Sequence, residues 1–221
     1  MQAEYFDLPG RAKAETLEAF QNLDRLNRLF IFSRPFEDVL PGWLGQERCA
    51  RLDILDIGAG TGLLGQMLCA WAAKRGWDWR CTNLDTNLLG LTMGNAPRLV
   101  LGSALELPFA DGSFDVVLAS QMTHHLTDEQ VTSHLREAWR VTRDALMISD
   151  LHRNPGLYAL LWLATLTRTD KSVRADALLS VKRGFKLGEL RALAEQAGVA
   201  NASVRLFYGT RVLMKARQAH G

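Results

Sequence analysis

The sequence predicts a doubly wound α/β fold, in which helices cover both faces of a mostly parallel sheet. Between residues 52 and 150, apolar runs of strand length alternate with segments in which apolar residues recur at helical spacing. Strands that are joined through helices need crossover connections, and such connections build parallel sheets. Two final apolar runs, separated by Gly209, predict an antiparallel hairpin, which completes a seven-stranded sheet with an antiparallel last strand.

Seven apolar runs account for the predicted strands. They are Leu52–Ile57, Trp79–Leu84, Leu99–Leu101, Phe114–Ala119, Ala145–Ser149, Ala202–Tyr208 and Thr210–Arg217. Helical spacing predicts helices over Thr61–Arg75, Asp128–Arg140 and Leu187–Ala197. Thr127 and Gln130 have the spacing of a capping box before the second of these helices.

Two segments depart from the alternation and predict helical additions to the sheet domain. Apolar residues at helical spacing predict an amphipathic helix over residues 11–33, with Pro35 and Pro41 ending that helix or interrupting the segment after it. Residues 155–184 hold an apolar piece followed by a basic stretch. We therefore expect an N-terminal helical cap over residues 1–45 and a main domain over residues 46–221, with residues 155–184 inserted as a helical cover.

Composition excludes several classes of protein. The chain has 221 residues, of which 48% are hydrophobic and 23% charged, so it can bury one large core. A net charge of +2 is too small to favour a nucleic-acid or membrane-surface partner. The longest apolar stretch, Leu157–Leu166, is about half of the roughly 20 residues that a membrane span needs. The first eleven residues also lack the layout of a signal peptide. These features favour a soluble, cytoplasmic protein and leave the oligomeric state open.

The three cysteines, Cys49, Cys69 and Cys81, stand apart in the sequence. An odd and scattered set is typical of reduced thiols in a core, and it matches neither a disulfide framework nor a zinc site.

The most informative segment is the turn after the first strand, where Gly58, Gly60 and Gly62 occupy alternate positions. Glycines allow a tight turn and a close approach to a ligand, and the following helix N-terminus offers unpaired N–H groups. A nucleotide-type ligand at the carboxyl ends of the strands is therefore expected. The glycines alone leave two cofactors open, because Gly60–Gly65 also fits the dinucleotide pattern G-x-G-x-x-G and Asp85 lies near the position of its ribose-binding acid.

Three motifs in order resemble the class I S-adenosylmethionine-dependent methyltransferases. Residues 56–62, D-I-G-A-G-T-G, are similar to the family's first motif. Residues 102–117 resemble the family stretch G-D-A-x-x-L-P-F-x-D-x-S-F-D-x-V, and residues 120–126 resemble its segment that ends in His-His-Leu. The resemblance covers about residues 50–150. It implies a Rossmann-like fold and S-adenosylmethionine as the cofactor.

The resemblance also implies a role for each position in these motifs. Asp56 would reach toward the ammonium group of the cofactor, and Asp85 would accept hydrogen bonds from its two ribose hydroxyls. The glycine loop would pass under the methionine part, Ala104 and Leu105 would flank the adenine, and residues 120–122 would border the sulfonium. The implied cofactor-binding residues are Asp56, Gly58, Ala59, Gly60, Thr61, Gly62, Asp85, Thr86, Ser103, Ala104, Leu105, Ser120, Gln121 and Met122.

One position departs from the family pattern. Ser103 stands where the family commonly has an Asp that accepts a hydrogen bond from the adenine amino group. This departure motivates one alternative, a non-catalytic accessory protein of methyltransferase fold. The dinucleotide pattern motivates another, an NAD-dependent oxidoreductase that uses Gly60–Gly65.

His124, Asp150 and His152 are the candidate catalytic residues, because they lie near the carboxyl ends of the fourth and fifth predicted strands. A base there could accept the proton that a hydroxyl or an activated carbon acceptor loses. No metal is expected, since Asp150 alone matches the acidic and Asn ligands of metal-assisted catechol enzymes. A looser likeness to methyltransferases of quinone and phenolic polyketide pathways favours O- or C-methylation of a small aromatic, phenolic or quinone-like acceptor.

Overall fold

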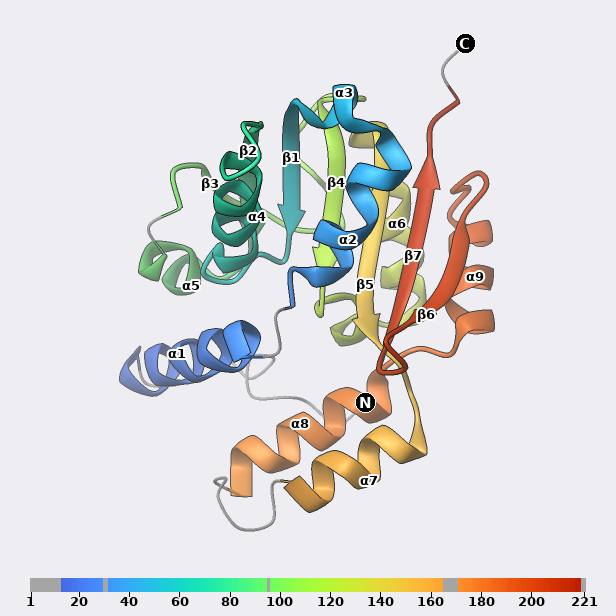
Figure 1. Cartoon of the computed structure of the whole chain (residues 1–221). Helices are drawn as coiled ribbons and strands as arrows, with labels where there is room; N and C mark the ends of the chain where they lie inside the picture. Colours follow the sequence, from blue (N-terminus) through green and yellow to red (C-terminus); the bar gives the residue numbers. More distant parts are fainter. Residues whose placement is uncertain (1–12, 30–31, 95, 165–170, 220–221) are drawn as a thin grey trace.

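The computed structural model describes the backbone of residues 13–29, 32–94, 96–164 and 171–219. Its strands form one mixed seven-stranded sheet in the order β3-β2-β1-β4-β5-β7-β6 (Figure 1). Their bounds are β1 Arg51–Ile57, β2 Asp78–Asp85, β3 Leu99–Leu101, β4 Phe114–Ser120, β5 Thr142–Leu151, β6 Ser203–Phe207 and β7 Arg211–Arg217. The helices are α1 Lys13–Leu29, α2 Arg34–Leu44, α3 Gln46–Cys49, α4 Leu63–Ala73, α5 Leu88–Met93, α6 Asp128–Val141, α7 Pro155–Ala164, α8 Lys171–Arg183 and α9 Leu187–Gln196, with a 3-10 turn, η2, at Thr123–His125.

The predicted sheet is confirmed. β1 pairs in parallel with both β2 and β4. β2 in turn pairs in parallel with β3, and β4 pairs in parallel with β5. β7 is antiparallel to its neighbours β5 and β6, so it is the one strand of the sheet that runs against the others. From β1 the chain builds the sheet first toward β2 and β3 and then, on the other side, toward β4 and β5. The carboxyl ends of β1 and β4 therefore meet at the topological switch point, where α/β sheets bind ligands.

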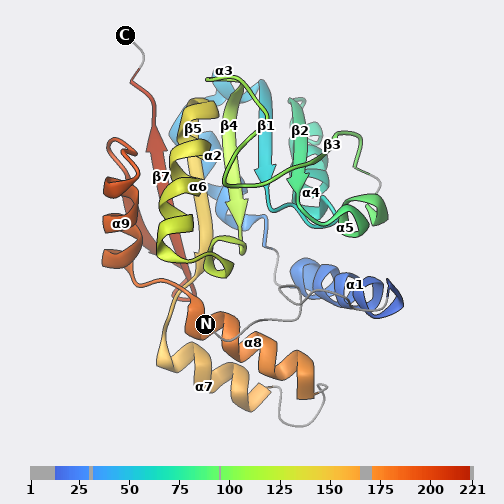
Figure 2. The same ribbon diagram turned by 180° about the vertical axis from the view of Figure 1, so that it is seen from behind.

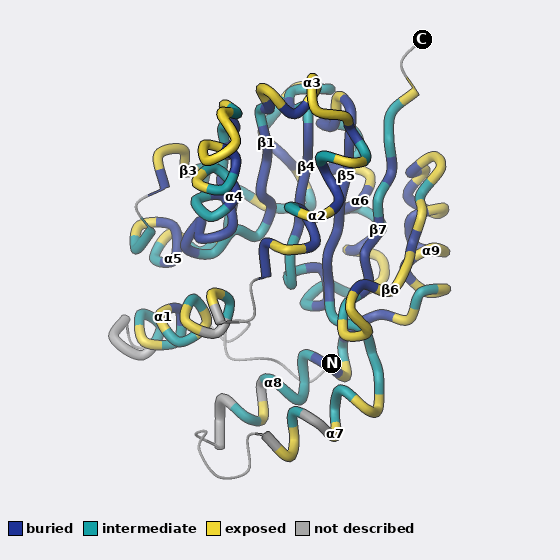
Figure 3. The backbone as a smooth tube through the Cα atoms, viewed as in Figure 1, coloured by how far each residue is buried: buried dark blue, intermediate teal, exposed yellow. Residues whose placement is uncertain are grey.

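Side chains of the central strands point alternately into two apolar layers, one on each face of the sheet. Leu55, Ile57 and Val117 are fully buried on the face that α6 and α9 cover (Figure 2). Ile54 and Leu118 are fully buried on the opposite face, which α2 and α4 cover. This alternation follows from the two-residue period of a strand. Figure 3 shows the central strands buried along most of their length, whereas the described side chains of α7 and α8 are half-buried or exposed apart from Val181, which is buried.

The N-terminal region differs from the expected single helix. The part described between residues 13 and 44 forms two helices, α1 and α2. Pro35 lies in the first turn of α2, where its missing N–H leaves no hydrogen bond unmade, and Pro41 lies inside the helix. Five side chains of α2 are buried, and their burial outweighs the helix-breaking effect of Pro41. They are Pro35, Phe36, Val39, Leu40 and Leu44.

The helical additions lie in two places. α2 packs on a sheet face, whereas α1, α7 and α8 lie beyond the edge formed by the carboxyl ends of the parallel strands (Figures 1 and 2). Residues 1–12, 30–31 and 165–170, which belong to the expected cap and cover, lie outside the described residues. In the described part of the chain, no helix has both the length and the apolar character needed to cross a membrane.

The packing of α2 leads to a stability prediction. Phe36 is fully buried in the α2 layer, so Phe36→Ala should lower the free energy of unfolding by about 3–5 kcal/mol. Leu23 of α1 is 39% exposed, and Leu23→Ala should change it by less than about 0.5 kcal/mol. Urea unfolding of both variants measures the difference. Equal losses would contradict the placement of α2 in the main core.

Candidate functional site

The glycine loop bends sharply between β1 and α4. Gly58, Gly60 and Gly62 have φ angles of 71°, 56° and 72°, respectively. Residues with a Cβ rarely adopt this region of backbone conformation. The N–H groups of Gly58 and Ala59 both donate to the carbonyl of Leu84, at 2.8 and 3.0 Å, which ties the loop to β2. The loop therefore holds a fixed shape at the switch point of the sheet.

Two glycines of the loop also pack closely against other segments of the chain. A Cβ added to Gly58 would lie 2.2 Å from Cγ of Met122, the residue two positions after β4. One added to Gly62 would lie 2.8 Å from Cβ of Ala96. These two glycines are thus required by space as well as by backbone conformation. The sequence predicted the backbone requirement but contained no signal for either contact.

Asp56, the next-to-last residue of β1, carries a buried carboxyl two positions before Gly58 of the loop. It is 2% exposed, and its Oδ2 has no hydrogen-bond partner among the described residues. Burial, and secondarily the nearby charge of Asp85, raises the pKa of Asp56 to about 8. A buried acceptor without a partner is costly. Asp56 is therefore suited to a cationic donor that enters from the loop side.

Asp85, at the end of β2, connects the loop to the next segment. Its Oδ2 accepts a hydrogen bond from the N–H of Gly60, and its Oδ1 accepts one from the N–H of Asn87, both at 2.8 Å. A carboxylate has about four lone-pair sites, so each oxygen can accept once more. Thr86, beside it, is exposed.

Helix α1 contacts the loop, which the sequence did not predict. The hydroxyl of Thr61 donates to the carboxylate of Asp24, at 2.9 Å from either oxygen. Burial raises the pKa of Asp24, although the hydrogen bond from Thr61 opposes that shift. The Phe20 ring lies 3.5 Å from the position of a Cβ on Gly60 and 2.6 Å from that of a Cβ on Gly90 in α5. Because these contacts join distant parts of the chain, helical spacing in α1 could not reveal them.

The segment after β3 forms its own turn. The Oγ of Ser103 accepts a hydrogen bond from the N–H of Leu105 at 3.1 Å, and Ser103 pairs with Glu106 in an isolated bridge. The Ala104 carbonyl lies 3.4 Å from Nδ1 of His134 in α6. Burial lowers the pKa of His134 to about 4, so this ring is neutral and packs beneath the turn.

The residues after β4 lie against β5. Gln121 has a φ of 53°, which is unusual for a residue with a side chain, and its N–H donates to the Ser149 carbonyl at 2.9 Å. Ser120 and Ser149 are paired in register, and each has a buried Oγ without a partner in the described part of the chain. Such polar atoms at the carboxyl edge are further places where a bound molecule could satisfy hydrogen bonds.

His124 and Asp150 form a buried pair. Nδ1 of His124 lies 2.6 Å from Oδ1 of Asp150, and the His124 N–H donates to Oδ2 at 3.2 Å. Burial alone would raise the pKa of Asp150, but the His124 ring and the N–H groups of Leu151 and His124 hold it below its usual value. A carboxylate at Nδ1 keeps the ring proton there, so Nε2 is the acceptor nitrogen of the neutral ring.

The sequence had predicted that Asp150 follows the fifth strand, but in the structure it lies within that strand. β5 runs from Thr142 to Leu151, longer than the expected Ala145–Ser149, and Asp150 lies within it with no exposed surface. The pairing of β5 with β7 continues to Leu151, opposite Arg211, and this long-range pairing extends the strand. His152 follows the strand as expected. Its N–H donates to the Thr210 carbonyl at 3.0 Å, and its Nδ1 is buried with no partner among the described residues.

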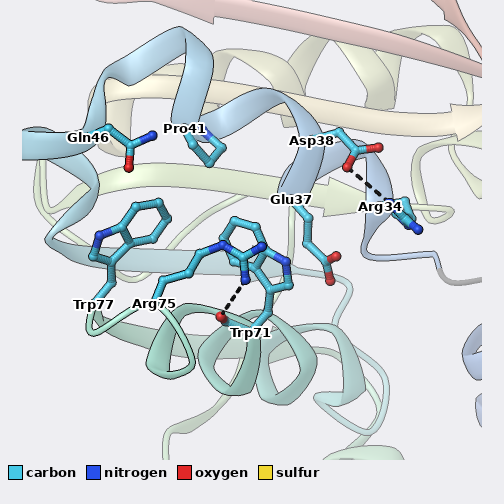
Figure 4. A pocket seen from close by; sticks show the side chains of 8 residues that line it. All are labelled: Arg34, Glu37, Asp38, Pro41, Gln46, Trp71, Arg75 and Trp77. Atoms are coloured by element: carbon cyan, nitrogen blue, oxygen red, sulfur yellow. Dashed lines mark hydrogen bonds and ion pairs between the residues drawn. The ribbon is translucent and has the colours of Figure 1, made fainter.

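A separate groove of about 510 Å³ lies between α2 and the C-terminal end of α4 (Figure 4). None of its lining residues belongs to the glycine loop or to the carboxyl ends of the strands. They are Arg34, Glu37, Asp38, Pro41, Gln46, Trp71, Arg75 and Trp77.

Comparison with known proteins agrees with this geometry. A family described as a methyltransferase domain matches residues 55–145. The demethylmenaquinone methyltransferase of Roseiflexus sp. (strain RS-1) is 34% identical over 119 residues, which is 49% of this chain and 47% of that protein. A ubiquinone/menaquinone biosynthesis C-methyltransferase of Dinoroseobacter shibae is 31% identical over 138 residues, or 56% of this chain and 52% of that protein. The chain spans about half the length of these relatives.

Solved structures share the fold at low sequence identity. A SAM-dependent methyltransferase from Aquifex aeolicus superposes with a TM-score of 0.61 at 14% identity, covering 94% of this chain and 99% of that one. Human N-acetylserotonin methyltransferase in complex with SAM gives a TM-score of 0.65 at 12% identity, covering 95% of this chain and 57% of that one. Residues 55–145 therefore match a methyltransferase domain, and the chain has the fold of the solved SAM-dependent methyltransferases.

Proposed function

We propose that this chain transfers the methyl group of S-adenosylmethionine to oxygen or carbon of a small aromatic, phenolic or quinone-like molecule. The observation that carries the proposal is Asp56, a buried carboxyl whose Oδ2 finds no partner among the residues that the structure describes, beside a loop that excludes side chains. The ammonium of an amino-acid moiety would give that carboxyl the donor it lacks. The relatives named for menaquinone and ubiquinone biosynthesis support a quinone-like acceptor.

The residues around Asp56 fit the rest of the cofactor. In the proposed mode, the backbone of Gly58–Gly62 lies under the methionine part, and Asp85 uses its remaining lone pairs for the ribose hydroxyls. Thr86 flanks the ribose, and the turn Ser103–Leu105 flanks the adenine. Ser103 already accepts from Leu105, so its hydroxyl is a weaker adenine acceptor than a carboxylate. Ser120, Gln121 and Met122 border the methyl group.

When bound, the cofactor supplies an electrophilic methyl on a positively charged sulfur, and the protein's work is positioning and proton transfer. Holding an acceptor in line with the methyl can supply roughly 7–11 kcal/mol. We propose that Nε2 of His124 accepts the proton that the acceptor loses, while Asp150 positions the ring through Nδ1. His152, whose Nδ1 lacks a partner among the described residues, is the alternative base.

The activity itself is tested by incubating the protein with methyl-labelled cofactor and a panel of phenols, hydroquinones and demethylated quinols. Mass spectrometry and NMR of the products distinguish O- from C-methylation. Calorimetry with S-adenosylhomocysteine and with NADH runs beside it. Transfer to a panel member supports the proposal. Binding of NADH without S-adenosylhomocysteine would favour an oxidoreductase, and binding of neither would favour an accessory protein.

Asp85→Asn should weaken binding of S-adenosylhomocysteine about 10- to 100-fold. The substitution removes charge-assisted hydrogen bonds, which contribute about 1.5–3 kcal/mol each. Asp78→Asn is the matched control, because Asp78 begins the same strand, is exposed and pairs with Arg80. Calorimetry measures both dissociation constants. An unchanged constant for Asp85→Asn would remove Asp85 from the ribose site.

The raised pKa of Asp56 predicts a pH-dependent stability for the ligand-free protein. Because its pKa rises from 3.8 to about 8 on folding, its stabilising contribution is complete below pH 4 and is lost as the pH rises toward 8. Asp56→Asn should remove this loss. The difference in unfolding free energy between wild type and variant should therefore shift in favour of the variant between pH 4 and pH 8, by roughly 1.4 kcal/mol per pH unit at most.

Urea unfolding of wild type and Asp56→Asn at several pH values measures this difference. Comparing the two chains cancels the opposite contribution of His134, whose pKa is lowered on folding. In the same series, wild-type binding of S-adenosylhomocysteine should weaken below pH 8, since Asp56 must lose its proton to pair with an ammonium. Parallel stability curves would show that Asp56 is ionised in the free protein.

His124→Ala should lower kcat by about 10²–10⁴-fold with little change in cofactor affinity. Asp150→Asn should lower kcat in the same direction, and the double variant should lose little more than His124→Ala alone, because the two residues act as one unit. Steady-state kinetics and calorimetry separate kcat from binding. A wild-type kcat in His124→Ala, with the loss appearing in His152→Ala instead, would assign the base to His152.

A further inference from the structure

Two of the three cysteines meet in the fold, although they are twelve positions apart in the sequence. Sγ of Cys69 on α4 lies 3.3 Å from Sγ of Cys81 on β2. Both thiols are free. The expectation of reduced core thiols holds for Cys49 and Cys81, which are buried in the core, whereas Cys69 is only half-buried and lies against Cys81. Sγ of Cys49 lies 3.8 Å from the Leu40 carbonyl.

The two sulfurs are held together by rigid elements. Gly65 lies one helical turn before Cys69, and a Cβ on it would lie 2.9 Å from Cβ of Cys81 and 2.6 Å from Oδ1 of Asn83. The helix backbone thus rests directly on the strand at this point. A disulfide needs its sulfurs at about 2.05 Å, so only a small further approach separates this pair from a covalent bond.

The two thiols have different environments, which suits a sequential reaction. Cys69 is half-buried, and Cys81 is 4% exposed. The hydrogen bond from Cys81 lowers the pKa of Cys69 to about 7 despite partial burial, and the charge of Arg98 acts in the same direction while Asp78 opposes it. The hydrogen bond with Cys69 and burial raise the pKa of Cys81. Cys69 therefore carries the reactive thiolate, and Cys81 lies in position to attack it afterwards.

We propose that Cys69 and Cys81 form an oxidisable pair that reacts with hydroperoxides and closes an intramolecular disulfide between α4 and β2. The Cys69 thiolate attacks one peroxide oxygen, so an S–O bond forms, the O–O bond breaks and the leaving hydroxide takes up a proton as water. Sγ of Cys81 loses its proton and attacks the Cys69 sulfur, so the S–S bond forms and the hydroxyl leaves as a second water. Two thiols are oxidised by two electrons, and one hydrogen peroxide is reduced to two waters.

This pair is separate from the proposed transfer chemistry. Cys69 lies in α4 and Cys81 in β2, and neither is among the proposed cofactor-binding residues. The modification can consequently be tested on the folded chain without any cofactor or acceptor.

The test treats the reduced protein with hydrogen peroxide and then counts thiols under denaturing conditions. Two of the three thiols should be lost, the intact mass should fall by two hydrogens, and peptide mapping should link the segments that carry residues 69 and 81. A thiol reductant should restore all three. Cys49→Ser is the matched control and should form the same link, because the Cys49 thiol is fully buried and its pKa is raised to about 11, chiefly by burial.

Two variants separate the steps. Cys81→Ser should stop at a sulfenic acid on Cys69, which dimedone labels, and Cys69→Ser should leave Cys81 unlabelled. A thiol count that stays at three, a loss that maps to Cys49, or links found only between molecules would each overturn the proposal. A Cys81→Ser protein that dimedone does not label would overturn the assigned order of attack.

Discussion

The site depends on one buried carboxyl at the point where the sheet changes direction. Asp56 is the next-to-last residue of β1, which lies between two parallel neighbours, and the loop at residues 58–62 has no side chains beyond those of Ala59 and Thr61. Because the loop is so small, residues at the ends of neighbouring strands reach its backbone. Asp85, at the end of β2, accepts a hydrogen bond from the N–H of Gly60, and Met122, after β4, packs against Gly58. A carboxyl that is costly to ionise alone becomes useful when a cation enters beside it.

Helices outside the central sheet contact the site from two sides. On the side of β2, α1 contributes Phe20 and Asp24 to the wall around the glycine loop. On the side of β5, α8 packs against η2, which carries His124. The proposed cofactor side and the proposed acceptor side are therefore covered by different helices. Their common location beyond the carboxyl edge is consistent with a cover over both, which remains a proposal for residues 155–184 (Figure 1).

Local sequence signals predicted the features that depend on neighbouring residues. Strand alternation, the capping box at Thr127 and the positive φ of Gly58, Gly60 and Gly62 are all local, and the structure contains each of them. Pro41 misled the interpretation of the N-terminal region, because burial of the apolar face of α2 outweighs a local helix-breaking preference. The extent of β5 was missed for a similar reason, since pairing with β7 sets its end.

Contacts between distant segments could not be predicted in this way. The Thr61–Asp24 hydrogen bond, the Phe20 ring over α5 and the Cys69–Cys81 contact each join elements that only the tertiary fold brings together. The family resemblance supplied candidate roles by position, yet it gave no information about burial. Burial is what distinguishes Asp56 and Asp150 as functional candidates here: within the described part of the chain, Oδ2 of Asp56 has no partner, and Asp150 is paired with a histidine.

A crystal structure with S-adenosylhomocysteine would show whether Asp56 receives the cation of the ligand. We expect the amino-acid nitrogen of the ligand within hydrogen-bonding distance of a carboxylate oxygen of Asp56, with the ligand lying over Gly58–Gly62. A ligand bound elsewhere, or a bound ligand whose amino-acid nitrogen lies beyond hydrogen-bonding distance of Asp56, would contradict this proposal.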